Sequence, residues 1–295
     1  MEELRRLLAR HARPDMTTPI DGVLVSRVER SDPSETSMSG TVLALIAQGE
    51  KRLALGDRVY DYRAGQYLVA SVDLPVTGRF VGATRDEPAL GFGLVLKPEA
   101  VAELLLAAGP GDLPREPGGT PSGLAVSDAS EELVDAVVRL LRLIDRPRDR
   151  AVLAPLVIRE ILWLVATGPQ GGVVRQLGLA DSGLSHVARA VRWIREHYAQ
   201  PFRVEDVARL SGMSVSAFYR NFQAVTAMSP IQFQKQIRLQ EARLLLATSP
   251  GDIAGVGHRV GYDSPSQFSR EYRRQFGTPP SQDTMLASRA AVALP

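Results

Sequence analysis

Apolar and polar residues alternate in short runs over the first third of the chain. Turns such as Gly56-Asp57 and Ala64-Gly65 separate runs that are typical of β-strands. The predicted strands are GVLVSRV (22–28), TVLALIA (41–47), KRLAL (51–55), RVYDY (58–62), YLVAS (67–71), RFVGA (79–83) and LGFGLVL (90–96). Their close spacing predicts a sandwich or a small barrel. On a period of two, the residues expected to point inward are Leu53, Leu55, Val59, Leu68 and Phe80.

The apolar pattern becomes helical after Pro98. Apolar stripes predict helices over 99–109, 129–144 and about 152–165, and the Pro/Gly-rich stretch 109–123 predicts an exposed loop. These helices are expected either to cover a face of the sheet or to form a dimer seam. From Ser185 onward Gly and Pro interrupt the pattern repeatedly, which predicts many short helices.

Two segments of the C-terminal third repeat one another at an offset of fifty residues. SVSAFYRNF (214–222) and SPSQFSREY (264–272) share the pattern Ser-x-Ser-x-Phe-x-Arg-x-aromatic. Upstream of them, VARLSG (207–212) resembles VGHRVG (256–261). Each copy therefore predicts a short helix that ends near a Gly, a turn, and a second helix that begins at a capping Ser.

Each predicted second helix has one apolar and one polar face. The apolar stripes contain Phe218, Phe222 and Val225 in the first copy, and Phe268 and Tyr272 in the second. The opposite faces carry Ser216, Tyr219, Arg220 and Gln223, and Ser266, Gln267, Ser269, Arg270 and Arg273. A helix-turn-helix with a polar, arginine-bearing second helix is typical of DNA-binding proteins. A helical bundle with arginines on its surface is the alternative, and two copies in register argue against it.

The distribution of charge points to the same region. Between Leu184 and Gln282 the chain has 13 Arg or Lys against 7 Asp or Glu, whereas the remainder has 22 against 26. A hydrophobic content of 44% is ordinary for a soluble protein, and no stretch is apolar enough to span a membrane. Residues 1–10 are charged and amphipathic, unlike a signal peptide, so we expect a cytoplasmic protein. The lack of cysteine excludes disulfides and thiolate chemistry.

These motifs resemble the AraC/XylS family of bacterial transcription regulators. The family pattern runs through VEDVARLSGMSVSAFYRNF (204–222) and GDIAGVGHRVGYDSPSQFSREYRRQFGTPPS (251–281), and the resemblance spans about 184–281. The stretch IAQGEKRLALGDRVYDYRAGQYLVASVDLP (46–75) resembles the cupin-like sensor domain of one subgroup. Ala227 departs from the pattern, because the family usually has Gly after the first recognition helix.

The resemblance implies an α+β chain. It has an N-terminal cupin-like barrel or sandwich with flanking helices, and an all-α C-terminal domain whose two helix-turn-helix units are joined by a long helix (231–247). The expected segments are a helical arm (1–20), the sensor domain (21–108), a linker and helical connector that includes a dimerisation region (109–183), the DNA-binding domain (184–282) and a tail (283–295).

The resemblance and the exposed faces together assign contacts with DNA. Base-reading is expected from Ser216, Tyr219, Arg220, Gln223, Ser266, Gln267, Ser269 and Arg270. Phosphate contacts are expected from Ser214, Ser264, Lys235, Arg238, Arg273 and Arg274. An alternative for each reading arginine is an ion pair with a carboxylate of the same fold.

The expected function is sequence-specific regulation of transcription. The expected partners are double-stranded DNA, RNA polymerase, a small-molecule effector and a second copy of the chain, with no cofactor. The effector pocket is expected to contain Tyr60, Tyr62, Tyr67, Phe80 and Phe92, although such aromatic residues belong to the core of a barrel more often than to a pocket. An alternative is a DNA-binding regulator without a ligand, whose N-terminal domain serves only dimerisation.

A cupin-type enzyme is the third interpretation. Cupin enzymes bind a metal ion through clustered His and Glu. The four histidines are His11, His186, His197 and His258, and none lies in the strand-rich region. We therefore expect no metal site and no enzymatic activity.

Overall fold

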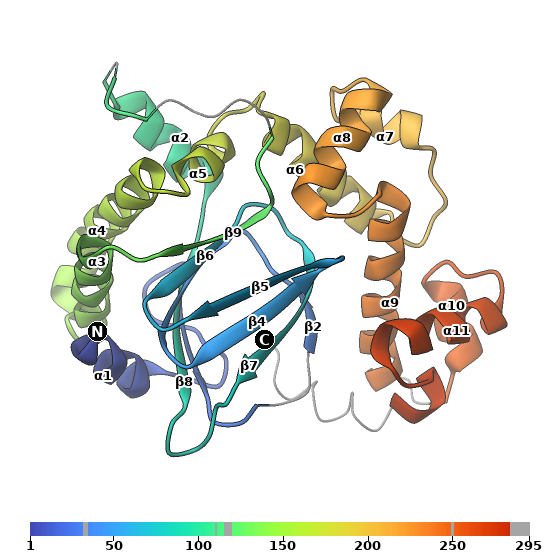
Figure 1. Cartoon of the computed structure of the whole chain (residues 1–295), viewed down its shortest axis with the longest axis horizontal. Coiled ribbons are helices and arrows are strands. Elements are labelled where there is room, and N and C mark those ends of the chain that lie inside the picture. Colours follow the sequence, from blue (N-terminus) through green and yellow to red (C-terminus); the bar gives the residue numbers. More distant parts are fainter. Residues whose placement is uncertain (32–34, 110, 115–119, 249–250, 284–295) are drawn as a thin grey trace. The chain divides into compact units, whose positions relative to one another are not determined.

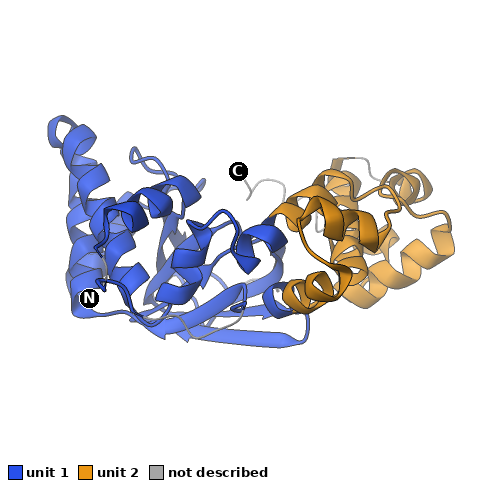
Figure 2. Ribbon diagram, turned by 90° about the horizontal axis from the view of Figure 1, so that it is seen from above, with its two compact units in different colours: residues 1–188, 224–227 blue, residues 189–223, 228–295 orange. Residues whose placement is uncertain are grey.

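The computed structural model of the chain describes residues 1–283 except 32–34, 110, 115–119 and 249–250. It divides into two compact units, shown in Figure 2. Unit one contains Met1–Ala188 and Ala224–Ala227, and unit two contains Arg189–Gln223 and Met228–Pro295. The helical arm, sensor domain and connector that the sequence analysis separated thus belong to one unit.

Unit one is built on two antiparallel sheets (Figure 1). The five-stranded sheet has the order β1 (Val23–Val28), β8 (Ala89–Val95), β3 (Val42–Gln48), β6 (Gln66–Ala70) and β9 (Leu124–Asp128). The four-stranded sheet has the order β2 (Glu35–Met38), β7 (Pro75–Val81), β4 (Glu50–Leu55) and β5 (Arg58–Arg63). All seven predicted strands are present, whereas β2 and β9 were not predicted.

The four-stranded sheet buries one face, as its alternating sequence requires. Leu53, Leu55 and Tyr62 are buried, while Arg52 and Asp61 pair on the opposite face with an Nε–Oδ1 distance of 2.6 Å. The prediction that Val59 points inward is wrong, since its side chain is 60% exposed. The register explains this: Val59 pairs with Ala54, on the face that carries Arg52 and Asp61.

Helix α1 packs on the five-stranded sheet, and four further helices of unit one contact one another. Helix α1 (Glu2–His11) buries Leu4 and Leu8 and contacts β1, β8 and β3. The other helices of the unit are α2 (Pro98–Ala107), α3 (Glu131–Arg142), α4 (Pro147–Thr167) and α5 (Gly171–Leu177), and α4 contacts α2, α3 and α5. Helix α1 therefore covers part of the five-stranded sheet, and the expectation that the helices over 99–109, 129–144 and about 152–165 cover a sheet face stays a prediction.

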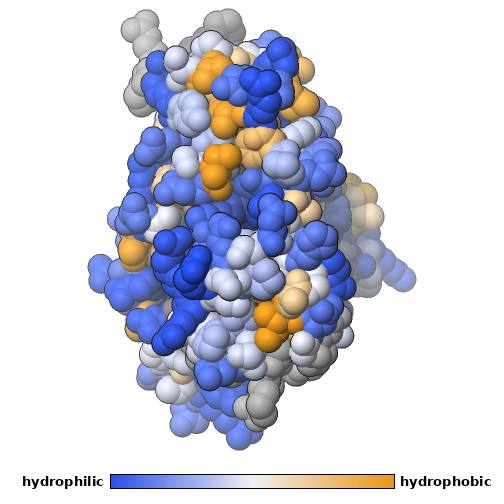
Figure 3. Space-filling model, turned by 90° about the vertical axis from the view of Figure 1, so that its right-hand side faces the viewer, coloured by the Kyte–Doolittle hydropathy of each residue, from blue (hydrophilic) through white to orange (hydrophobic). Residues whose placement is uncertain are grey.

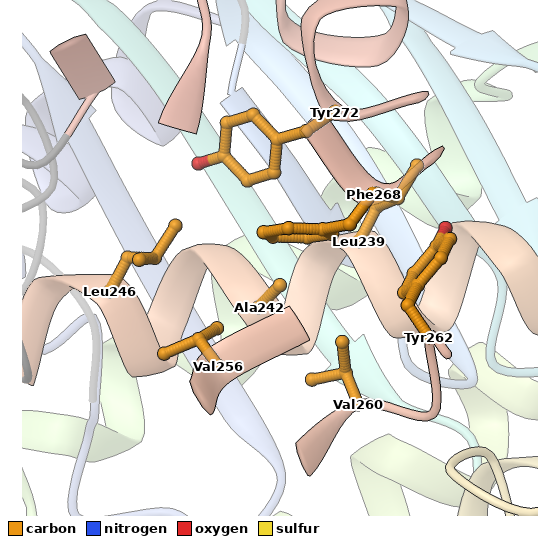
Figure 4. Packing of buried hydrophobic residues seen from close by; sticks show 8 residues of the cluster. All are labelled: Leu239, Ala242, Leu246, Val256, Val260, Tyr262, Phe268 and Tyr272. Carbon is orange, nitrogen blue, oxygen red and sulfur yellow. The ribbon is translucent and has the colours of Figure 1, made fainter. Parts of the chain in front are cut away.

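Helices of 7 to 19 residues follow from residue 183 onward. They are α6 (Gly183–Glu196), α7 (Val204–Leu210), α8 (Val215–Thr226), α9 (Pro230–Thr248), α10 (Ile253–Arg259) and α11 (Pro265–Phe276). The boundary between the units falls within α6. Figure 4 shows one core of unit two, in which Phe268 and Tyr272 of α11 pack against Leu239 of α9 and Val256 of α10.

Within the described ranges, no helix is both long and apolar enough to cross a membrane. The same residues contain no group of three or more His, Asp or Glu side chains placed to hold a metal ion. His197, for example, stacks on Trp193 with ring centroids 4.4 Å apart, which gives it a packing role.

Candidate nucleic-acid interface

The two sequence repeats form the same turn. The first helix of each copy, α7 or α10, ends in a glycine with positive φ: Gly212 at 75° and Gly261 at 90°. The next backbone N–H reaches back to the carbonyl five residues earlier, from Met213 to Ala208 and from Tyr262 to Gly257, both at 2.9 Å. This is a Schellman ending, and it requires a residue that tolerates the left-handed conformation.

The second helix of each copy, α8 or α11, begins at the predicted serine. Ser214 Oγ accepts a hydrogen bond from the Ala217 N–H, and Ser264 Oγ accepts one from the Gln267 N–H, each at 3.3 Å. The predicted apolar stripes are buried completely: Phe218, Phe222, Val225, Phe268 and Tyr272 have no exposed side-chain surface. The helix-turn-helix prediction is therefore correct in both copies.

The opposite faces of α8 and α11 are exposed. All four predicted base-reading residues of α8 lie in solvent, including Tyr219 at 44% exposure. On α11, Ser266, Gln267 and Arg270 are exposed and Ser269 is half-buried. Hydrophilic side chains cover most of the face in Figure 3, which is viewed from the side where α10 and α11 lie in Figure 1. Among the described residues, these faces are therefore polar and exposed to solvent.

The residues expected to bind phosphate differ in their exposure and in their contacts within the protein. Ser214 and Ser264 cap their helices, and Arg273 and Arg274 are exposed near the end of α11. Lys235 of α9 is paired instead, since its Nζ lies 3.1 Å from Glu271 Oε1.

Arg238 of α9 has a structural role that the sequence analysis did not identify. Its Nε donates to the Tyr198 carbonyl at 2.7 Å, Nη1 to the Gly261 carbonyl at 2.7 Å, and Nη2 to the Ala199 carbonyl at 3.3 Å. Burial lowers the pKa of this guanidinium. These carbonyls take three of the five N–H donors of a guanidinium, so the phosphate contact of Arg238 stays a prediction beside this structural role.

Glu271 of α11 accepts hydrogen bonds from three elements. Tyr262 Oη donates at 2.9 Å, Lys235 Nζ lies at 3.1 Å, and Gln267 Nε2 donates at 3.4 Å. Burial tends to raise the pKa of Glu271, but these hydrogen bonds outweigh it and hold the pKa below its ordinary value. The carboxylate is therefore ionised, and the i, i+4 spacing of Gln267 and Glu271 was the sequence signal for this pair.

A second carboxylate, that of Asp283, links α9 and α11. Asp283 is fully buried, accepts a hydrogen bond from Tyr272 Oη at 2.7 Å, and lies 3.0 Å from Arg243 Nε. Burial, together with this bond, raises the pKa of Tyr272. Asp283, the first residue of the predicted tail, thus packs within unit two. Residues 284–295, the rest of the predicted tail, lie outside the described residues.

The structure does not bring the predicted effector-pocket aromatics together. Tyr60, Tyr62 and Phe80 share the inner face of the four-stranded sheet, because Tyr60 pairs with Leu53, and both Tyr62 and Phe80 pair with Lys51. Tyr67 and Phe92 belong to the other sheet, on the face that also carries Leu94. Hydrogen bonds link Tyr67 to Ser127 and to the backbone of Gln170, the N-cap of α5. As a single pocket, the predicted set is wrong.

Unit one instead has a cavity of about 670 Å³ between strand β8 and helices α2 and α4. Its wall includes Ile20, Leu94, Ala154 and Leu162, all buried. Lys97, which pairs with Asp21, also lies on this wall. None of the five predicted aromatics contributes to it.

Comparisons with known proteins agree with this arrangement. A family model described as the N-terminus of AraC-type transcriptional regulators matches residues 19–173, and a helix-turn-helix domain model matches 207–284.

Curated relatives are similar over part of their length. The virulence regulon transcriptional activator VirF of Yersinia enterocolitica is 30% identical over 168 residues, which cover 57% of this chain and 62% of VirF. ExsA of Pseudomonas aeruginosa is 33% identical over 131 residues, which cover 44% of this chain and 47% of ExsA. The chain thus spans less than two thirds of the curated relatives that it matches.

Solved structures share the fold. Apo ToxT from Vibrio cholerae aligns with a TM-score of 0.54 at 10% identity, over 92% of this chain and 100% of ToxT. The N-terminal family model alone matches more than half of the chain, and the two helix-turn-helix units complete the pattern. The chain belongs to the AraC-type transcriptional regulators.

Proposed function

We propose that this chain regulates transcription by binding a specific site on double-stranded DNA. The observation that carries the proposal is the pair of helix-turn-helix units with the same Schellman turn, the same serine cap and polar faces on α8 and α11. In this arrangement the second helix of each unit enters the major groove. Bases are read by the exposed residues of the two faces, of which Arg220 and Arg270 are the strongest candidates.

The length of α9 suits two reading units on one duplex. Its 19 residues extend about 28 Å, close to the roughly 34 Å that separates successive major grooves on one side of DNA. One chain therefore has two readers for two adjacent grooves. RNA polymerase is a further partner in this proposal, which places the protein in the cytoplasm and, when bound to DNA, at the nucleoid.

The test compares three alanine variants. Arg220→Ala and Arg270→Ala are each expected to weaken binding to the cognate site by about 1–3 kcal/mol and binding to random DNA far less. Arg85→Ala removes the same charge from an exposed position of unit one and is the matched control. Equal losses of binding free energy on both DNAs would show that Arg220 and Arg270 contact phosphates and not bases.

We further propose that a small-molecule effector controls this activity by binding unit one. The cavity beside β8 supports this, because its volume lies in the range of small-molecule sites. ToxT, which shares the fold, has been solved with an unsaturated fatty acid bound. The test is a thermal-shift screen of metabolites on the wild type and on Ala100→Phe, which fills the cavity from a partly exposed position. A compound that raises the melting temperature of the wild type should not raise that of Ala100→Phe. A compound that raises both would show that it binds outside this cavity.

The regulator without a ligand stays a second candidate, because one observation favours dimerisation. Four apolar side chains on α2 and α4 are exposed: Leu106 at 87%, Val152 at 66%, Leu153 at 40% and Leu156 at 60%. A second copy of the chain that packs on α2 and α4 would bury these four side chains. Leu156→Glu is expected to yield monomers in analytical ultracentrifugation, whereas Val59→Glu, equally exposed on β5, leaves the dimer intact. A monomeric wild type would refute this proposal. No observation in the described residues favours a cupin-type enzyme.

A further inference from the structure

Glu271 connects a base-reading position to the rest of unit two. Its side chain is 16% exposed and receives hydrogen bonds from Gln267 on the same helix, Lys235 on α9 and Tyr262 in the turn before α11. Gln267 is exposed and lies in the first turn of α11, whose N-terminal residues approach the base edges in a helix-turn-helix. The carboxylate thus contacts a side chain that faces DNA in the proposed function.

The chemistry of the two side chains fixes the orientation of the Gln267 amide. An ionised carboxylate only accepts hydrogen bonds, so Gln267 must turn its NH₂ group toward Glu271. The amide nitrogen has two hydrogens, and we take the one directed back along the side chain as the one donated to Glu271 Oε1. Its second hydrogen and the amide oxygen then point together away from the protein. This donor–acceptor pair matches N7 and the N6 amino group of adenine.

We propose that Glu271 is a positioning residue that holds the Gln267 amide in the orientation that selects adenine at one position of the site read by α11. The inference rests on the proposed DNA-binding function. Glu271 itself does not touch the base and acts through Gln267.

Glu271 has a second effect through Lys235. The ion pair keeps the ammonium group of Lys235 at 3.1 Å from the carboxylate, so its charge is compensated within the protein. Removing the negative charge of Glu271 frees this lysine for phosphate. Each additional phosphate contact steepens the dependence of log K on log salt by about 0.9. A purely structural role of Glu271 predicts no such change.

The test uses the full chain and an isosteric variant. Binding-site selection with the wild type and with Gln267→Ala first identifies the position that Gln267 reads. Glu271→Gln is then expected to reduce the preference for adenine at that position by about fivefold, while binding to random DNA rises and its salt dependence steepens by about 0.9. In the Gln267→Ala background, Glu271→Gln should change base preference no further.

Tyr262→Phe is the matched control. It removes only the donor to Oε2 and leaves the contacts of Gln267 and Lys235 with Oε1, so adenine preference should persist. A Glu271→Gln variant that keeps its adenine preference overturns the inference and leaves the proposed function standing, as does a Gln267→Ala variant that changes no position. Equal loss of binding to all DNA, with a lowered melting temperature, also overturns it. A wild type that selects no site overturns both proposals.

Discussion

Arg238 stabilises unit two by donating to three backbone carbonyls, of which that of Tyr198 also accepts a hydrogen bond from Gln234 Nε2 at 3.0 Å. Replacing it with methionine keeps the alkyl chain but leaves the carbonyls of Tyr198, Ala199 and Gly261 without these bonds. We expect Arg238→Met to lower the free energy of unfolding by about 2 kcal/mol in urea denaturation, and the exposed control Arg192→Met to change it by less than about 0.5 kcal/mol. An unchanged salt dependence of DNA binding in Arg238→Met would limit Arg238 to this structural role, and a shallower dependence would show that it also contacts phosphate.

Glu271 also makes stability depend on pH. Its pKa in the folded chain lies below the ordinary value of 4.5, so the protein gains stability from this carboxylate above that pH and loses it as the pH falls further. The difference in unfolding free energy between the wild type and Glu271→Gln should therefore be largest at neutral pH and shrink below about pH 4.5. A difference that is constant with pH would show that the ionised form contributes nothing.

The residue that ends each recognition helix in a left-handed conformation is an alanine after α8 and a glycine after α11. Ala227 follows α8 with a φ of 57°, while Gly277 follows α11 with a φ of 78° and donates to the Arg273 carbonyl at 2.8 Å. A left-handed conformation costs a residue with a Cβ about 1–2 kcal/mol, part of which glycine's flexibility in the unfolded chain offsets. Ala227→Gly should therefore stabilise the protein by about 0.5–1 kcal/mol, and Gly277→Ala should destabilise it similarly. Thermal unfolding checks both, and unchanged midpoints would contradict this account.

Some elements could be predicted from the sequence and others could not. Both helix-turn-helix units were predictable because glycine, serine and the aromatic stripe each act within one or two turns of their own helix. Strand β9 was not, because Leu124–Asp128 follows a Pro/Gly-rich stretch and is defined only by pairing with Gln66–Ala70. The aromatic pocket failed for a related reason: which face of which sheet holds Tyr60 or Tyr67 depends on register between distant strands. The structural role of Arg238 was not predictable, because its partners are backbone carbonyls, which every residue has.

The whole molecule combines an acidic unit one with a basic unit two that contains two helix-turn-helix units. The excess of Arg and Lys between Leu184 and Gln282 predicts that binding weakens steeply as salt is raised, since neutralised phosphates release counterions. Gel-shift titrations between about 50 and 200 mM salt measure this slope. A slope near zero would mean that the basic region does not contact the phosphate backbone.

Whether the chain reads two adjacent grooves is tested by a genome-wide binding-site selection with the purified wild type, Arg220→Ala and Arg270→Ala. The account predicts a motif of two blocks about one helical turn apart, with one block lost in each variant. A single block, or two blocks that both variants lose together, would contradict the double reader.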